Sequence, residues 1–321
     1  MKNRLGLLAL LFLTYSILAG QIPPSDNSGP GARQGIELVI LGTLQDGGSP
    51  HMGCAKQCCA TLFKTPDPMR KVVSLGILDA LDKKTYLFEA TPDIATQMSL
   101  LKESASFETQ TTPDGIFITH AHIGHYAGLM FLGRESMNAE AVPVYALPRM
   151  RQFLSSNGPW DQLVRLQNIL LKPISEDAGI ALSSGIKVVP FTVPHRDEYS
   201  ETAGFEISGP EKRVLFIPDI DKWDRWEVSL AERLTEVDFA FLDATFFDAA
   251  EIGYRDIKEI PHPFVIETMK LLEALPAGLK NKVYFIHLNH TNPLLDPKSD
   301  AAQKVLAAGF RIARVGDRFK L

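Results

Sequence analysis

Cysteine is scarce in this 321-residue sequence, and the three that occur lie together in the stretch PHMGCAKQCC: Cys54, Cys58 and Cys59. Cysteines so close together, and odd in number, exclude an ordinary disulfide framework. A Cys54–Cys58 disulfide in an oxidising compartment is one alternative. The other is a structural zinc ion, which needs four nitrogen or sulfur ligands. For the fourth ligand, His51 is local and His290 is the other candidate.

An excess of positive charge is also absent, because 33 Lys and Arg stand against 38 Asp and Glu, a net charge of -5. Proteins that bind nucleic acid carry a basic patch, so we expect no nucleic-acid partner. Hydrophobic residues make up 45% and charged residues 22% of the chain. These proportions are typical of a globular protein with a sizeable core.

No long hydrophobic run occurs after the first twenty residues, MKNRLGLLALLFLTYSILAG. Two basic residues, a short apolar run and small residues are typical of a secretory signal peptide. The run is shorter than the roughly 20 residues that span a bilayer, although an uncleaved anchor is the alternative. We predict a signal peptide over residues 1–20, a flexible lead-in over 21–35 and one folded domain over 36–321. The protein would be exported, periplasmic or secreted, with no stable membrane span after cleavage.

Short apolar segments rich in β-branched and aromatic residues predict strands along the whole chain. They lie at residues 36–42, 72–80, 84–90, 115–119, 186–195, 203–208, 213–219, 237–243 and 282–287, and around AVPVYALP at 141–148. Helices are expected between them, at residues 91–103, 129–132, 148–158, 223–236, 262–275 and 299–308. The alternation favours an α/β domain with two mixed sheets packed together, helices outside and two similar halves.

Three of the eight histidines fall within six positions, in THAHIGHYAG, directly after the predicted strand at 115–119. In an extended segment His120 and His122 point the same way and can hold one metal ion. His125 lies beyond Gly124, where the chain can turn towards a second ion. Imidazole is a preferred ligand of zinc and iron, so the cluster predicts a metal site rather than a chance grouping.

Other ligand-type residues also follow predicted strands directly, namely His195, Asp219 and His287. Strand ends held by a rigid sheet are where chemistry is usually placed, so we expect these residues to converge. Asp219 would bridge two ions, although an Asp there can also be a helix N-cap. Asp221 and Asp243 are weaker candidates, because Asp often occurs in turns.

A second loop, with Asp46 followed by Gly47 and Gly48, comes after the first predicted strand. Its backbone amides could line the pocket, or it is simply a turn.

The stretch HAHIGH resembles the H-x-H-x-D-H signature of the metallo-β-lactamase superfamily. The series His120, His122, His125, His195, Asp219 and His287 matches its ligand order. The resemblance implies an αββα sandwich, with two mixed β-sheets flanked by helices and a mono- or dinuclear metal site at the strand ends. Gly124 stands where the signature has an acid, so one of the two metal sites should be weaker or built differently.

A narrower resemblance, to coenzyme PQQ synthesis protein B and its relatives, is carried by LGTLQDGGSP, THAHIGHYAGLMFLGRE, LDATFFD and FIHLNHTNP. His195 with ETAGF, and Asp219, look more like the hydrolytic branch, such as the phosphodiesterase of phosphonate breakdown. Relatives of that kind hold a structural zinc with three cysteines and a histidine, which favours His290. They also imply that His262 is a general acid; a locally packed histidine at a helix start is the alternative.

These residues support three hypotheses for a small-molecule substrate or ligand. In a metal-dependent hydrolase, activated water would attack a phosphoryl or acyl centre, with Asp219 and His262 as catalytic residues. Zinc is expected at the structural cysteine site and at the catalytic site. Iron or manganese is an alternative at the catalytic site. In an iron-dependent oxygenase, which the PQQ resemblance implies, the same ligands would serve iron. The third hypothesis is a non-enzymatic carrier of a small polar ligand. Its metal ions would serve structure, and protein ligands would fill all of their coordination positions. The sequence predicts neither the substrate nor the oligomeric state.

Overall fold

The computed structural model describes residues 35–253 and 257–321. The predicted signal peptide and nearly all of the predicted lead-in lie outside the described residues. Within the described ranges, no helix is both long enough and apolar enough to cross a membrane.

The first sheet has seven strands in the order β14-β1-β2-β3-β4-β5-β6. Their bounds are β1 Ile36–Gly42, β2 Ser74–Asp79, β3 Lys84–Phe88, β4 Gly115–Phe117, β5 Val142–Ala146, β6 Ile169–Pro173 and β14 Arg318–Lys320. Pairing is antiparallel from β14 to β3 and parallel from β3 to β6. The helices of this half are α1 Gln57–Ala60, α2 Ile94–Ser104, α3 Ile123–Tyr126, α4 Pro148–Ser156 and α5 Trp160–Arg165.

The second sheet also has seven strands, in the order β13-β12-β11-β10-β9-β8-β7. Their bounds are β7 Ile180–Ala181, β8 Lys187–Val193, β9 Thr202–Ser208, β10 Arg213–Ile217, β11 Phe239–Asp243, β12 Val283–Ile286 and β13 Arg311–Ile312. Pairing is antiparallel from β7 to β10 and parallel from β10 to β13. The helices are α6 Leu230–Glu236, α7 Ala249–Ile252, α8 Val265–Leu271, α9 Ala277–Lys280 and α10 Asp300–Ala307.

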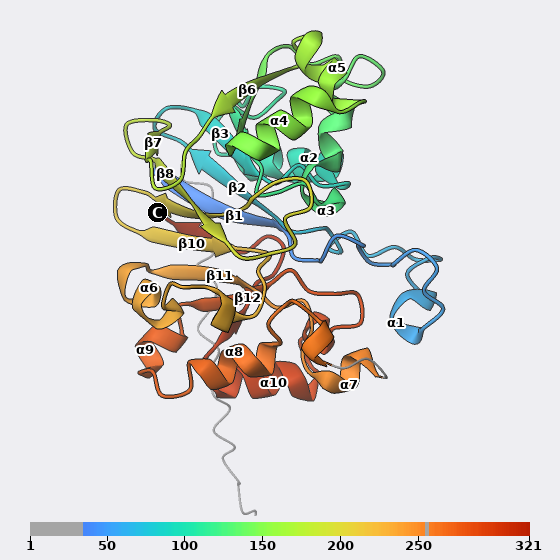
Figure 1. Cartoon of the computed structure of the whole chain (residues 1–321), viewed down its shortest axis with the longest axis vertical. Helices are drawn as coiled ribbons and strands as arrows, with labels where there is room; N and C mark the ends of the chain where they lie inside the picture. Colours follow the sequence, from blue (N-terminus) through green and yellow to red (C-terminus); the bar gives the residue numbers. More distant parts are fainter. Residues whose placement is uncertain (1–34, 254–256) are drawn as a thin grey trace, which may run out of the picture. The chain divides into compact units, whose positions relative to one another are not determined.

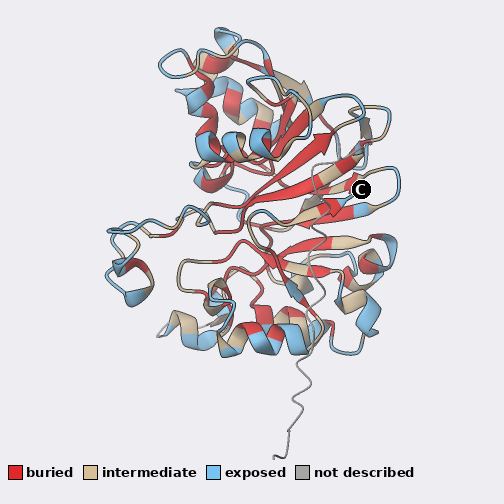
Figure 2. Cartoon of the chain, turned by 180° about the vertical axis from the view of Figure 1, so that it is seen from behind, coloured by how far each residue is buried: buried red, intermediate tan, exposed pale blue. Residues whose placement is uncertain are grey.

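The two sheets form the middle of the molecule and helices form its outer layers. Figure 1 shows α2, α4 and α5 beside the first sheet and α8, α9 and α10 beside the second. Buried residues concentrate on the strands between these layers, and the helices are exposed on their outer faces (Figure 2). The predicted αββα sandwich of two mixed sheets is confirmed.

Aromatic rings from both sheets fill the space between them. Phe88 of β3 stacks on Phe117 of β4 with ring centroids 4.7 Å apart. The same ring meets Phe205 of β9 edge-on at 5.4 Å and Phe216 of β10 at 6.3 Å. All four side chains are fully buried, so this cluster joins the two halves of the molecule.

Strand direction brings several chain segments to one edge of each sheet. Because β1 and β3 each pair antiparallel with β2, and β3 is parallel to β4, these three strands run the same way. By the same reasoning β8, β10, β11 and β12 share one direction. Their carboxyl ends, which precede the predicted ligands, therefore lie at a common edge.

Two local predictions are wrong in part. The run at 129–132 is not a buried α-helix but part of a 3-10 helix, Ala127–Leu132. Met130 and Phe131 are 47% and 41% exposed, because this tighter helix turns them away from the core. The predicted helix at 223–236 is divided into a 3-10 turn, Trp223–Arg225, and α6.

Replacing Phe205 by Ala should lower the free energy of unfolding by about 3–5 kcal/mol, because it leaves a cavity between the sheets. Urea denaturation followed by circular dichroism measures this loss. Phe63, which is 56% exposed, provides the matched control, and its replacement by Ala should change the stability by less than about 0.5 kcal/mol. Equal losses in the two variants would contradict the assigned core.

Candidate metal centre

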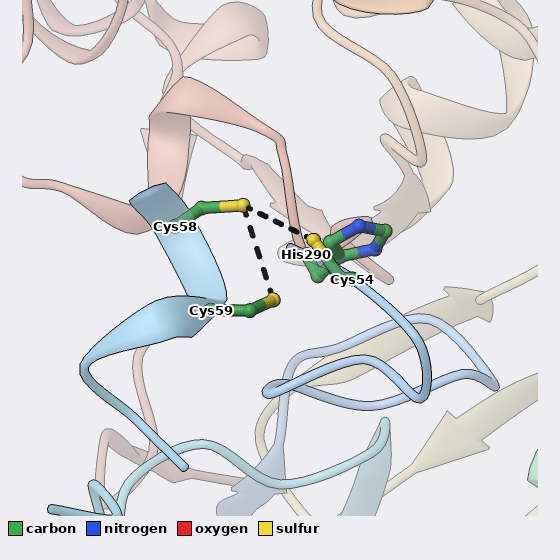
Figure 3. A group of neighbouring side chains, drawn as sticks. All are labelled: Cys54, Cys58, Cys59 and His290. Atoms are coloured by element: carbon green, nitrogen blue, oxygen red, sulfur yellow. Dashed lines mark hydrogen bonds between the residues drawn. The ribbon is translucent and has the colours of Figure 1, made fainter. Parts of the chain in front are cut away.

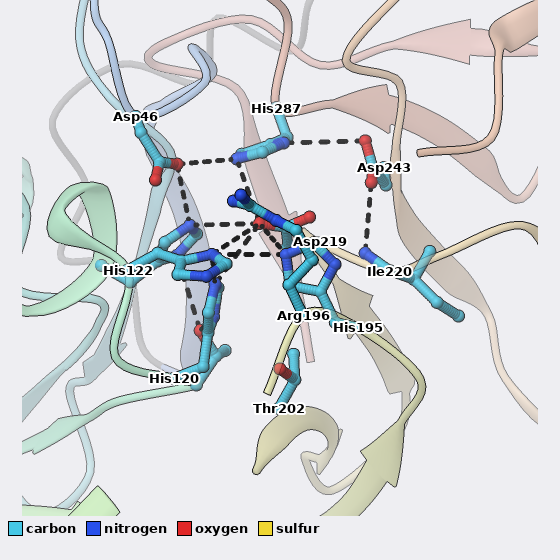
Figure 4. A network of polar contacts seen from close by, with 12 residues as sticks. Asp46, His120, His122, His195, Arg196, Thr202, Asp219, Ile220, Asp243 and His287 are labelled. Atoms are coloured by element: carbon cyan, nitrogen blue, oxygen red, sulfur yellow. Dashed lines mark hydrogen bonds and ion pairs between the residues drawn. The ribbon is translucent and has the colours of Figure 1, made fainter. Parts of the chain in front are cut away.

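The six residues predicted as ligands come from four different strand ends and meet in one place. Figure 4 labels five of them, His120, His122, His195, Asp219 and His287. His120, His122 and His125 follow β4, whereas His195, Asp219 and His287 follow β8, β10 and β12. One oxygen, Asp219 Oδ2, lies 3.3 Å from His195 Nε2, 3.4 Å from His120 Nε2 and 3.7 Å from His125 Nε2. His122 Nδ1 and His287 Nε2 are each 4.0 Å away. A single carboxylate oxygen is thus surrounded by five imidazoles.

These side chains form two overlapping groups, each with ligand atoms within 4.8 Å of one another. The first group consists of His120, His122, His195 and Asp219. The second consists of Asp46, His125, Asp219 and His287. Asp219 belongs to both, which is the arrangement expected of a carboxylate that bridges two ions.

Each of the five imidazoles has its outer ring nitrogen next to an oxygen atom. The pairs are His120 Nδ1 with Thr119 Oγ1 (2.9 Å), His122 Nε2 with Glu198 Oε2 (3.1 Å), His125 Nδ1 with Glu89 Oε1 (3.2 Å), His195 Nδ1 with Asp221 Oδ1 (3.2 Å) and His287 Nδ1 with Thr245 Oγ1 (2.9 Å). Histidines that bind metals almost always donate their other N–H to such an oxygen. The rings are therefore held with one nitrogen facing inwards.

Asp219 is buried, with 2% of its surface exposed. Burial acts to raise its pKa, but the charges of His195, His262 and His287 hold that pKa well below its usual range. Within the described part of the chain, Asp219 Oδ1 accepts no hydrogen bond of good geometry, although His262 Nδ1 is 3.1 Å away. A buried carboxylate oxygen without a donor, next to inward-facing imidazole nitrogens, fits a bound cation.

Neighbouring carboxylates favour the protonated form of two of these histidines. Burial lowers the pKa of His195, but Asp219 and Asp221 outweigh it and raise that pKa to about 9. The pKa of His125 is likewise raised well above its usual value, by Asp46 and Glu89 against the effect of burial. Because a metal ion needs the unprotonated nitrogen, a cation bound here displaces these protons.

Two residues of the centre hold a strained backbone. Glu89 and His287 have φ angles of 75° and 63°, in the left-handed region that residues other than glycine rarely adopt. Such strain costs on the order of 1–3 kcal/mol per residue and clusters at functional sites. Both side chains are fully buried, so the surrounding structure fixes them in these positions.

His262, predicted as a general acid, lies beside the centre. Its Nδ1 is 2.8 Å from Asp243 Oδ2 and 3.1 Å from Asp219 Oδ1. Burial lowers the pKa of His262, but Asp243 and Asp219 together raise it well above its usual value. Asp221 and Asp243, the weaker candidates, lie behind His195 and His262 as hydrogen-bond partners.

Sequence reasoning missed three acidic side chains near the histidines: Asp46, Glu89 and Glu198. Glu89 follows β3 directly at the same sheet edge, but the predicted strand at 84–90 included it, so its place at a strand end was not recognised. Asp46 lies four residues beyond the end of β1, and its predicted contribution was only a turn or backbone amides. Its carboxylate Oδ1 instead lies 3.1 Å from His125 Nε2 and 3.2 Å from His287 Nε2.

The cysteine cluster forms a separate group with His290 (Figure 3). Cys58 Sγ lies 3.9 Å from both Cys54 Sγ and Cys59 Sγ, and all three cysteines are free. A tetrahedral site with Zn–S bonds of about 2.3 Å places its sulfur atoms about 3.8 Å apart, so the spacing fits zinc. His290 Nδ1 lies 2.9 Å from Asn289 Oδ1. His51 is not part of this group, but its ring stacks on that of His290.

A family model described as the β-lactamase superfamily domain matches residues 84–288, more than half of the chain. Coenzyme PQQ synthesis protein B of Xanthomonas oryzae pv. oryzae is 24% identical over 306 residues, which cover 88% of this chain and 98% of that protein.

Solved structures show the same fold. Zn(2+)-bound PqqB from Methylobacterium extorquens superimposes with a TM-score of 0.70 at 21% identity, covering 89% of this chain and 100% of that one. A diphosphatase of the PhnP family gives a TM-score of 0.61 at 22% identity, covering 89% and 97%. With its αββα sandwich, its histidines at the strand ends and its match to the family model, this chain belongs to the β-lactamase superfamily and is similar to coenzyme PQQ synthesis protein B.

Proposed function

We propose that this protein is a metal-dependent hydrolase that cleaves a phosphodiester or another ester of a small molecule. The observation that carries the proposal is the set of five imidazoles around Asp219, each with its outer nitrogen fixed by an oxygen. His120, His122, His195 and Asp219 would hold one ion, and His125, Asp219 and His287 would contribute to a second. When bound, zinc ions of this kind lower the pKa of water and stabilise negative charge on a phosphoryl or acyl oxygen.

The chain itself supplies a proton donor for the leaving group. Asp243 and Asp219 contact the His262 ring at Nδ1 and favour its protonated form. A protonated imidazole beside the reacting centre can pass a proton to the departing oxygen. The side chain of His262 is 11% exposed, which leaves part of the ring open to a substrate.

The position of Arg196 favours a substrate that carries negative charge. It follows His195 directly, and Figure 4 draws its side chain in front of the centre. Its side chain is 55% exposed. Arg196 Nη1 lies 3.9 Å from Glu198 Oε1, and Glu198 Oε2 lies 3.1 Å from His122 Nε2, so the guanidinium is one residue removed from a proposed metal ligand. Guanidinium groups recognise phosphates by paired hydrogen bonds.

Replacing His120 by Ala should lower kcat/KM for bis(4-nitrophenyl) phosphate by more than about 100-fold, because losing even a partner of a ligand costs about 10–100-fold. Circular dichroism should show that the variant stays folded, and Asp161→Ala on the surface is the control. Full turnover by His120→Ala would refute the proposal. Purified protein that contains iron and consumes oxygen with a tyrosine-like substrate would favour the oxygenase.

Replacing Arg196 by Ala should raise KM for the same phosphodiester about tenfold and leave kcat within about twofold, since a hydrogen bond to a charged group contributes about 1.5–3 kcal/mol. A neutral ester should show no such change. Arg165→Ala, which removes an arginine that is 67% exposed on α5, is the matched control. An unchanged KM for the phosphodiester would exclude Arg196 from substrate binding.

The cysteine group is proposed to bind a structural zinc ion through Cys54, Cys58, Cys59 and His290. Cys58→Ser should then lose one zinc ion per chain, measured by inductively coupled plasma mass spectrometry, and lower the melting temperature. Met52→Ser, at a residue of the same loop that is 88% exposed, should keep the full zinc content. Equal zinc content in both variants would show that these cysteines do not bind zinc.

A further inference from the structure

The space beside Gly124 is filled by a side chain from a distant part of the sequence. A Cβ atom added to Gly124 would lie 2.6 Å from Asp46 Cα, 2.6 Å from Asp46 Cγ and 2.7 Å from Asp46 Oδ1. Real Cβ atoms do not approach other atoms this closely, so no larger residue fits at 124 while Asp46 keeps its position. Gly124 is itself buried, at the start of α3 and next to His125.

The carboxylate of Asp46 faces the second group of ligand atoms. Its Oδ1 lies 3.1 Å from His125 Nε2 and 3.2 Å from His287 Nε2, and its side chain is 14% exposed. The outer nitrogens of both histidines are already next to Glu89 and Thr245. Both inner nitrogens are therefore directed at the space in front of Asp46, where two imidazoles and a carboxylate form three sides of a cation site.

The loop that carries Asp46 is fixed against the segment that carries His287. The backbone N–H of Gln45 donates to the carbonyl of Leu288 at 2.9 Å, and the N–H of Gly48 donates to the carbonyl of Gln45 at 2.9 Å. Gly48 has a φ of +64°, which favours glycine, and a Cβ on Gly47 would lie 2.5 Å from the His51 ring. The two glycines thus allow a tight turn that directs Asp46 inwards.

We propose that Asp46 is the terminal carboxylate ligand of a second metal ion, with His125 and His287, and that Gly124 is a glycine because Asp46 occupies its side-chain space. The loop after β1 and the loop after β4 thus meet at one position that has room for a single acidic side chain. In this protein that side chain is Asp46. This inference rests on the part of the proposed function that places metal ions among the histidines. It is independent of the reaction that the ions support.

An exchange of the two residues tests the inference. Full-length wild type, Asp46→Gly, Gly124→Asp and the double variant Asp46→Gly/Gly124→Asp are stripped of metal and titrated with Zn²⁺ against a chromophoric chelator. Asp46→Gly should bind the second ion of the histidine centre at least about tenfold more weakly, as expected when a metal site loses a supporting group. The double variant should regain part of that affinity and melt at a higher temperature than Gly124→Asp. The backbone at position 46 must still shift, because its Cα remains and lies 2.6 Å from the new Cβ. Gly124→Asp alone should melt at a lower temperature, because the two side chains collide.

Gln45→Ala is the matched control, since it alters the same loop but removes no acid. The Gln45 side chain accepts a hydrogen bond from the Gly47 N–H at 3.1 Å. This variant should keep the second ion. Unchanged affinity in Asp46→Gly would overturn the ligand assignment, and a folded double variant no better than Asp46→Gly would overturn the exchange. Wild-type protein that binds both ions but hydrolyses neither a phosphodiester nor another ester would instead contradict the proposed function and leave the assignment of Asp46 as a ligand intact.

Discussion

The buried carboxylate of Asp219, surrounded by imidazoles, is the interaction on which the rest of the centre depends. An isolated charge in the interior costs several kcal/mol unless partners of opposite charge surround it. The chain provides such partners from both halves, because β4 supplies three histidines and β8 and β12 supply one each. Without an ion these groups must share protons, as the pKa directions of His195 and His125 show. A divalent cation satisfies the same charges without that competition.

A second layer of polar groups keeps the first in place, and this layer also comes from both halves. Glu89 and Thr119 follow strands of the first sheet, whereas Asp221 and Thr245 follow strands of the second. The distance between the sheets therefore determines the distances within the centre. The aromatic cluster around Phe88 and Phe205 packs between the sheets and maintains that separation. A change in core packing that alters the separation of the sheets should therefore also alter the geometry of the site.

The sequence predicted the fold, and it pointed to six residues at strand ends that the structure brings together, because both depend on local patterns. Apolar segments identified most of the strands, and a ligand-type residue directly after a strand, such as His195, was visible from position alone. Asp46 was not predictable in this way. It lies in a glycine turn beyond β1, and its contact with Gly124 joins residues 78 positions apart. Likewise, nothing in the spacing of Met130 and Phe131 indicated a 3-10 helix rather than an α-helix.

Two chain segments run side by side from the histidine centre to the cysteine group. One carries Asp46, His51 and then Cys54, and the other leads from His287 to His290. At one end the N–H of Leu288 donates to the carbonyl of Thr43 and the N–H of Gln45 donates to the carbonyl of Leu288. At the other end the rings of His51 and His290 stack.

An ion bound at one end would make the two segments more rigid. A second ion that binds at the other end would then lose less conformational entropy. Thermodynamic linkage makes this relation reciprocal. Binding of the proposed ions at the two ends of this pair would therefore be coupled.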